Sequence, residues 1–244
     1  MINQKVHKLL EDNRYLFGGM PISFDGVVDE ESYLASRVRT AFLLKDINGI
    51  EIKEENGIKV EKMMDTDWEY MNDLRKDILN PNKSLYKTWP NACLWLELLK
   101  NPNTTYASCI TENEEFDQSR LRYNMLAVSI INLKKTPGRG SSNHDEILNA
   151  IDYGAQMIKE EIDIVDPQLI ICGGTFHYAV RLFNVSKDEQ KMLPSGAHYF
   201  VVDKRVYVEF VHPIWYSVNR RILFSYAKSV LPEIMKVVDE QNNR

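Results

Sequence analysis

Cysteine is scarce in this chain and gives no sign of a metal or disulfide framework. Cys93, Cys109 and Cys172 are widely separated, and no Cys-x-x-Cys pair occurs. This spacing suits neither disulfide pairing nor a structural zinc site, and three thiolates are too few for a four-cysteine iron–sulfur cluster. We therefore expect reduced thiols in a cytoplasmic protein that uses no metal and no cofactor.

Long apolar runs are also missing. The segment from Met1 to Phe17 has no apolar core of about 7–15 residues, so it does not resemble a signal peptide. No run of about 18 apolar residues occurs anywhere, so the sequence predicts no membrane span.

The chain has no excess of basic residues, and it lacks several common motifs of nucleotide-binding proteins and serine hydrolases. The chain has 30 basic and 35 acidic residues, for a net charge of −5. This balance argues against strong non-specific binding of nucleic acid, although a local basic patch is compatible with it. The sequence has no G-x-G-x-x-G fingerprint, no P-loop and no G-x-S-x-G elbow, which argues against dinucleotide binding, P-loop chemistry and serine hydrolysis.

The overall amino-acid composition is that of a folded globular protein. With 244 residues, 44% of them hydrophobic and 27% charged, the chain predicts a single domain over residues 1–244. Two polar stretches, near 49–62 and 101–117, are expected to be loops or small insertions.

Four apolar segments predict strands, at 38–44, 125–131, 169–172 and 205–211. The first three are nearly continuous apolar runs, which is typical of strands covered on both faces of a parallel sheet. The fourth contains Glu209 and alternates more, so we expect it nearer an edge. Helical patterns separate the strands, and the sequence therefore predicts a three-layer α/β/α sandwich around a four-stranded parallel sheet.

The clearest helical pattern joins the second and third strands. It begins with the Ser-x-x-acid form at Ser142–Asp145, continues with apolar residues at helical spacing from Ile147 to Val165, and stops before Pro167. Further helices are expected over residues 65–79 and 91–100, after Gly174, from about Tyr216 to Ala227, and after Pro232.

Each predicted strand ends in polar or glycine residues. These endings are Asp46, Asn132, Gly173-Gly174 and His212. Ligands of open parallel sheets bind outside the carboxyl ends of the strands, so the four endings predict one functional site. Each also has a simpler explanation: a turn at Asp46 or Asn132, a tight strand-to-helix connection at the glycines, or a structural histidine.

Taken in order, three of these endings resemble the motifs of the uracil-DNA glycosylase superfamily. The segments are Leu44-Lys45-Asp46-Ile47-Asn48-Gly49, Ser129-Ile130-Ile131-Asn132 and His212-Pro213-Ile214-Trp215-Tyr216-Ser217. The first departs from the family pattern, because Ile47 stands where the family usually has proline.

The resemblance implies a role for each ending. Asp46 would position water, Asn132 would contact the edge of the base with help from Asn48, and Trp215 and Tyr216 would form the wedge that replaces a flipped base. The implied partner is DNA carrying a damaged or modified base, most naturally a uracil-type base, in DNA repair.

The chemistry of base release agrees with these roles. Cleavage of the glycosidic bond passes through an oxocarbenium-like sugar and an anionic base, which a carboxylate (Asp46) and a hydrogen-bond donor (His212) would stabilise. The basic residues expected at DNA phosphates are Lys134, Lys135, Arg139 and Arg220.

Two alternatives stay open. One is a non-catalytic protein of the same fold that binds a nucleotide or nucleic acid. The other is an unrelated α/β enzyme acting on small molecules.

Overall fold

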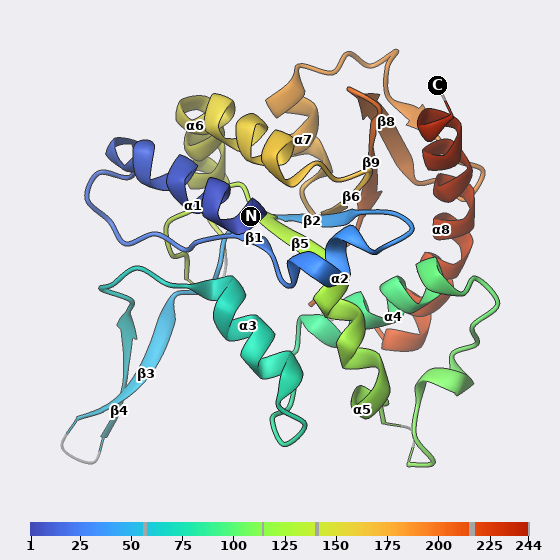
Figure 1. Ribbon diagram of the computed structural model, residues 1–244, viewed down its shortest axis with the longest axis horizontal. Coiled ribbons are helices and arrows are strands. Elements are labelled where there is room, and N and C mark those ends of the chain that lie inside the picture. Colours follow the sequence, from blue (N-terminus) through green and yellow to red (C-terminus); the bar gives the residue numbers. More distant parts are fainter. Residues whose placement is uncertain (56–57, 114, 140–141, 215–217, 244) are drawn as a thin grey trace.

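A mixed sheet of seven strands forms the centre of the protein. The computed structural model describes residues 1–55, 58–113, 115–139, 142–214 and 218–243 (Figure 1). In spatial order the strands are β1 (Gly26–Val27), β5 (Val128–Asn132), β2 (Thr40–Leu44), β6 (Leu169–Gly173), β9 (Arg205–Phe210), β8 (His198–Val202) and β7 (Lys191–Met192).

The four strands expected from the sequence lie side by side in the middle of this sheet. Strand β2 pairs in parallel with both β5 and β6, and β6 pairs in parallel with β9. The α/β class is therefore confirmed. The expected strand number was wrong, because β1 extends one side of the sheet and β8 and β7 the other, all through antiparallel pairing.

Two further expectations about the strands need correction. Strand β9 is internal, since β8 pairs with its outer side, and Glu209 is accommodated without an edge position. The segment expected to open the second strand forms instead a 3₁₀ helix, η3 (Arg122–Ala127), and β5 starts only at Val128.

Helices cover both faces of the sheet, as a three-layer sandwich requires (Figure 1). On one face lie α1 (Ile2–Asp12), α6 (His144–Val165) and α7 (Phe176–Phe183), and on the other lie α3 (Tyr70–Leu79), α4 (Trp89–Lys100) and α8 (Arg220–Asn242). The short helices are η1 (Arg14–Phe17), α2 (Glu30–Leu34), η2 (Ala107–Cys109) and α5 (Gln118–Leu121).

Alternation along the buried strands divides the core between the two faces. In β2, Phe42 and Leu44 pack with the α4 and α8 side, whereas Ala41 and Leu43 pack with the α6 side. All five residues of β2 are buried, because the side chains of a strand point alternately to opposite faces and both faces are covered. This explains the unbroken apolar run in the sequence.

The helices largely follow the expected pattern, with differences at their ends. The N-cap of α6 is Asn143, whose side chain accepts from the Asp145 amide, rather than Ser142. Helix α8 runs without a break through Pro232, although two separate segments were expected.

The polar stretch near 49–62 is an antiparallel hairpin of β3 (Ile50–Glu55) and β4 (Ile58–Met63) that projects from the body of the protein (Figure 1). The stretch near 101–117 contains η2 and an isolated bridge between Ile110 and Phe116. No helix among the described residues has the length and apolarity needed to cross a membrane.

A cluster of charged side chains is buried between β5, α6 and the segment before β1. We call Asp25, Lys135 and Glu161 the buried lysine cluster. Lys135 is fully buried, and its ammonium donates to Asp25 at 2.8 Å and to Glu161. Burial opposes the charge of Lys135, but the two carboxylates outweigh it and raise the pKa of Lys135; burial also raises the pKa of Glu161.

Replacement of Lys135 should therefore be costly. Lys135→Met leaves the buried Asp25 carboxylate without its cation, and loss of one partner of a buried ion pair costs about 3–5 kcal/mol. The free energy of unfolding, measured with urea, is expected to fall by this amount. Lys8→Met is the control, because Lys8 pairs with Asp12 on the surface and an exposed pair contributes at most about 1 kcal/mol. Equal losses in the two variants would contradict this account of the cluster.

Candidate functional site

The polar strand endings lie at one edge of the sheet because β5, β2, β6 and β9 are parallel. Asp46 follows β2, which is the strand at which the chain order doubles back: β5 lies on one side of it and β6 on the other. Such a switch point is where open α/β sheets bind their ligands. Asp46 therefore stands at the position where a site is most expected.

The Asp46 carboxylate is held in a nearly buried position, with 6% of its side chain exposed. Its Oδ1 accepts a hydrogen bond from the Ser142 hydroxyl at 2.5 Å, and the Lys134 ammonium lies 3.8 Å from its Oδ2. Burial raises the pKa of Asp46, while Ser142 and Lys134 act against that shift. Gly138 packs so closely that a Cβ there would lie 2.0 Å from Oδ2.

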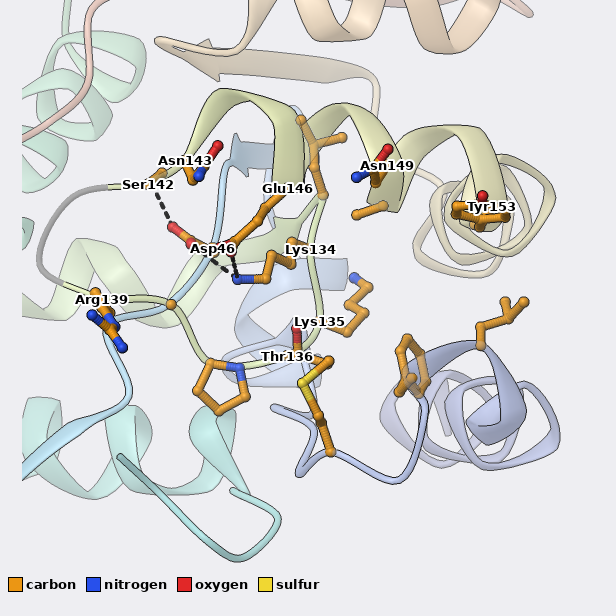
Figure 2. Close-up of a pocket in the computed structure, with 18 of the residues that line it drawn as sticks. Asp46, Lys134, Lys135, Thr136, Arg139, Ser142, Asn143, Glu146, Asn149 and Tyr153 are labelled. Carbon is orange, nitrogen blue, oxygen red and sulfur yellow. Dashed lines mark hydrogen bonds and ion pairs between the residues drawn. The ribbon is translucent and has the colours of Figure 1, made fainter. Parts of the chain in front are cut away.

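A cavity of about 860 Å³ opens beside Asp46. Figure 2 shows Asp46 linked to Ser142 and Lys134, with Arg139 on one side and Tyr153 toward the opposite end. Its apolar walls come from η1, the loop before α6 and one side of α6, and include Leu16, Phe17, Met20, Leu133, Ala150 and Met157. A polar end and an apolar end in one cavity of this size suit a small organic ligand or a nucleotide.

Of the cations expected at phosphates, Lys134 and Arg139 line this cavity. Lys134 is engaged by Glu146 at 2.6 Å as well as by Asp46. Arg139 is exposed, and no carboxylate in the described part of the chain pairs with it.

Two of the expected phosphate contacts fit less well. The prediction for Lys135 was wrong, because its side chain is fully buried between two carboxylates and cannot reach a phosphate. Arg220 lies at the start of α8, away from the cavity, with its guanidinium 5.6 Å from the centre of the Phe116 ring.

His212 follows β9 and is held as a neutral imidazole. Burial, with a smaller effect of Lys45, lowers the pKa of His212 to about 4. Its Nδ1 lies 3.1 Å from the Ile214 amide, which donates to it. A neutral imidazole whose Nδ1 accepts a hydrogen bond carries its proton on Nε2. His212 therefore presents an N–H donor from Nε2.

Asn132 is engaged within the protein. It is 2% exposed, its backbone amide donates to Asp25 Oδ2 at 2.5 Å, and its Nδ2 donates to Asp25 Oδ1 at 3.2 Å. Neither Asn132 nor His212 lines the cavity beside Asp46. The structure thus gathers Asp46, Lys134 and Arg139 around one cavity and leaves Asn132 and His212 at neighbouring strand ends.

The remaining predicted contacts are Asn48, Trp215 and Tyr216. Asn48 is exposed, and its side-chain oxygen accepts from the Ile50 amide at 3.2 Å, so it stabilises the turn into the β3–β4 hairpin. Trp215 and Tyr216 lie outside the described residues.

Sequence reasoning missed the contacts of three polar residues at this edge. Asp25 holds Asn132, and Ser142 holds Asp46 through its side chain. Asn91, at the start of α4, donates from Nδ2 to the Pro213 carbonyl at 2.5 Å, and its buried Oδ1 has no hydrogen-bond partner among the residues that the structure describes. Each contact joins residues that are about 100 positions apart in the sequence, so no local motif indicates it.

Comparison with known proteins gives no relative from which the site could be interpreted. No protein-family model matches the chain, and no curated protein matches it either. No group of three or more His, Cys, Asp or Glu side chains that could hold a metal ion occurs among the described residues.

The state of His212 can be tested directly by NMR. We expect its ring to titrate with a midpoint near pH 4, because burial disfavours the imidazolium, and the neutral ring to carry its proton on Nε2. Ring ¹⁵N and ¹Hε1 shifts followed from pH 3 to 8 measure both properties. His7, which is about half-exposed, serves as an internal comparison. A His212 midpoint near 6.5, the ordinary value, would contradict the assigned environment.

Proposed function

We propose that this protein is a DNA glycosylase-like enzyme that hydrolyses the N-glycosidic bond of a damaged or modified base, most naturally a uracil-type base. The observation that carries the proposal is that a fixed carboxylate, Asp46, and a neutral donor, His212, follow two parallel strands of the sheet and lie at the same edge. The resemblance of three strand endings to the uracil-DNA glycosylase superfamily supports the same activity.

The spacing of the two groups suits a nucleotide. Asp46 and His212 follow β2 and β9, which are separated by β6 alone. Two inter-strand spacings amount to about 10 Å, comparable with the length of a sugar and its base. A nucleotide lying along this edge would bring its sugar to Asp46 and its base toward His212.

Each group would then have a defined task. As the bond from C1′ to the base nitrogen breaks, its electron pair goes to the base and positive charge develops on the sugar. Asp46 would stabilise that charge and orient the water whose hydroxyl joins C1′. His212 would donate from Nε2 to the base oxygen that becomes negative. The second proton of the water passes to solvent and then to the base, which gives the free base and an abasic sugar.

The desolvated position of Asp46 strengthens this role. Electrostatic interactions gain strength when water is excluded, and the carboxylate is nearly buried yet borders the cavity. Ser142 and Gly138 hold it in place from two sides, so little reorganisation is needed when charge develops nearby.

The DNA contact we propose is modest in strength. Arg139, Lys134 and Arg220 are the candidate phosphate contacts, and Lys134 is shared with Glu146. The net charge of −5 opposes strong binding to DNA. Affinity should also fall as the salt concentration rises, because each phosphate contact releases counterions.

A non-catalytic protein that binds a nucleotide or nucleic acid is the second candidate. The engagement of Asn132 with Asp25 favours it, because a base-contacting amide is then partly occupied before any ligand arrives. The two candidates differ in whether an abasic site forms.

The central experiment replaces Asp46. Single-turnover base release is measured on duplex and single-stranded oligonucleotides carrying uracil, hypoxanthine or xanthine. Asp46→Asn removes the charge and preserves the shape, so base release should be abolished while DNA affinity stays largely intact. Salt-dependent binding by the wild-type protein without any abasic site would favour the non-catalytic candidate, and a fully active variant would remove Asp46 from the mechanism.

A second variant tests the donor. His212→Ala should lower the rate of the chemical step by about 10²–10³, the usual loss for one donor to a developing oxyanion, with substrate affinity little changed. The control is His198→Ala, since His198 lies on β8 and pairs with Glu209 on the surface. A wild-type single-turnover rate in His212→Ala would exclude this role.

A further inference from the structure

The peptide group between Pro213 and Ile214 is hydrogen-bonded on both sides. Its carbonyl oxygen accepts from Asn91 Nδ2 at 2.5 Å, and its N–H donates to His212 Nδ1, with 3.1 Å between the two nitrogens. The group is trans, and in a planar trans peptide the carbonyl and the N–H point in opposite directions. The direction of the carbonyl therefore fixes that of the N–H, so Asn91 and His212 are connected through one rigid group.

Helix α4 presents Asn91 on the same face that packs against the end of β9. Asn91 and Trp95 are four residues apart, and residues at this spacing are neighbours on one face of a helix. The Trp95 ring packs edge-on against Phe210, the last residue of β9, with 4.9 Å between the ring centres. Both Asn91 and Trp95 are buried. The turn that carries His212 is thus docked on α4 by an apolar contact before it and a hydrogen bond after it.

The glycines at the end of β6 close the other side of this turn. A Cβ on Gly173 would lie 3.1 Å from Pro213 Cδ, and a Cβ on Gly174 would lie 3.6 Å from His212 Cβ. The proline ring also fixes its own φ. The turn therefore has little room on the β6 side, and the orientation of the peptide after Pro213 is left to be set by Asn91.

An amide at position 91 has a cost for the fold. Its Oδ1 is buried without a hydrogen-bond partner in the described part of the chain, and an unsatisfied buried acceptor is destabilising. An apolar side chain would avoid this cost, and the next two residues, Ala92 and Cys93, are apolar and fully buried. What the amide adds is the donor at Nδ2, and that donor is directed to the peptide that contacts His212.

We propose that Asn91 is a positioning residue for His212: it holds the Pro213–Ile214 peptide so that Nδ1 of the ring is occupied and the proton stands on Nε2. This inference rests on the proposed function, in which that Nε2–H donates to the departing base. The hydrogen bond from Asn91 also polarises the peptide and strengthens the donation from the Ile214 amide. Without Asn91 the peptide is free to turn, and Nδ1 then competes with Nε2 for the proton.

The first test removes the donor. Asn91→Leu fills the same space with an apolar side chain, and single-turnover base release should fall about tenfold or more, yet less than the 10²–10³ expected for His212→Ala. Asn124→Leu is the matched control, because Asn124 is also buried and donates from Nδ2 to a carbonyl of α4, that of Cys93, at 3.2 Å. Its rate should stay within about twofold of the wild type, since distant sites act independently. A wild-type rate in Asn91→Leu, or equal losses in the two variants, would contradict the proposal.

A double variant shows whether Asn91 acts through His212. Residues that work as one unit have non-additive effects, so Asn91→Leu should change the rate by less than about twofold in a protein that already carries His212→Ala. A loss as large in this background as in the wild type would mean that the effect of Asn91 does not pass through His212, and it would overturn the inference.

The His212 ring gives a readout that does not depend on activity. Burial, with a smaller effect of Lys45, lowers the pKa of His212 to about 4, and a hydrogen bond donated to Nδ1 favours the neutral ring as well. In Asn91→Leu the titration midpoint should therefore rise, and the ring ¹⁵N shifts should show a mixture of the two neutral tautomers. Asn124→Leu should match the wild type in both respects. An unchanged midpoint and tautomer in Asn91→Leu would refute the positioning role.

Two further measurements keep the proposal testable if Asn91→Leu does not fold. Asn91→Ala also removes the donor and takes its place in each experiment. In the wild type, the Asn91 side-chain NH₂ and the Ile214 backbone amide should exchange slowly with solvent, and fast exchange of either would overturn the inference. If the wild type releases no base while the His212 tautomer depends on Asn91, the proposed function fails and the positioning of the ring stands.

Discussion

Parallel pairing of β5, β2, β6 and β9 is the constraint on which the rest of the structure depends. Parallel strands need long return connections across a sheet face, so the helices between them cover both faces and bury both sides of every central strand. The same pairing brings all four carboxyl ends to one edge. Polar residues that are distant in the sequence therefore share one edge, and the doubling back of the chain at β2 places Asp46 in the middle of it.

Charged groups are buried near the carboxyl end of β5. The end of β5 must bury Asn132 and Lys135 where the chain turns toward α6, and a buried ammonium is tolerated only with carboxylate partners. Asp25 and Glu161 supply them from the segment before β1 and from α6. Buried ion pairs contribute little net stability compared with apolar packing, whereas removal of one partner is costly, so the three members of this cluster depend on one another.

The sequence was informative where the structure repeats a simple pattern. Continuous apolar runs predict β2, β5 and β6 because both faces of these strands are covered, and helical spacing predicts α6. Strands β1 and β7 have only two residues each, too few for a period of two to be visible. Asp46 and His212 were chosen as candidates because each follows a predicted strand. The burial of Lys135 was not foreseen, because it depends on Asp25, which precedes β1, and on Glu161, which lies on α6, and only the folded structure brings these two residues together.

The contact between the loops after β2 and β5 has a mechanical consequence. The Gly138 amide donates to the Ile47 carbonyl, the Gly49 amide donates to the Gly138 carbonyl, and Met64, at the base of the β3–β4 hairpin, donates to the Gly49 carbonyl. Asp46 thus sits on a backbone ladder that the projecting hairpin continues. The position of the loop that carries Asp46 is therefore tied to the base of the hairpin by three backbone hydrogen bonds.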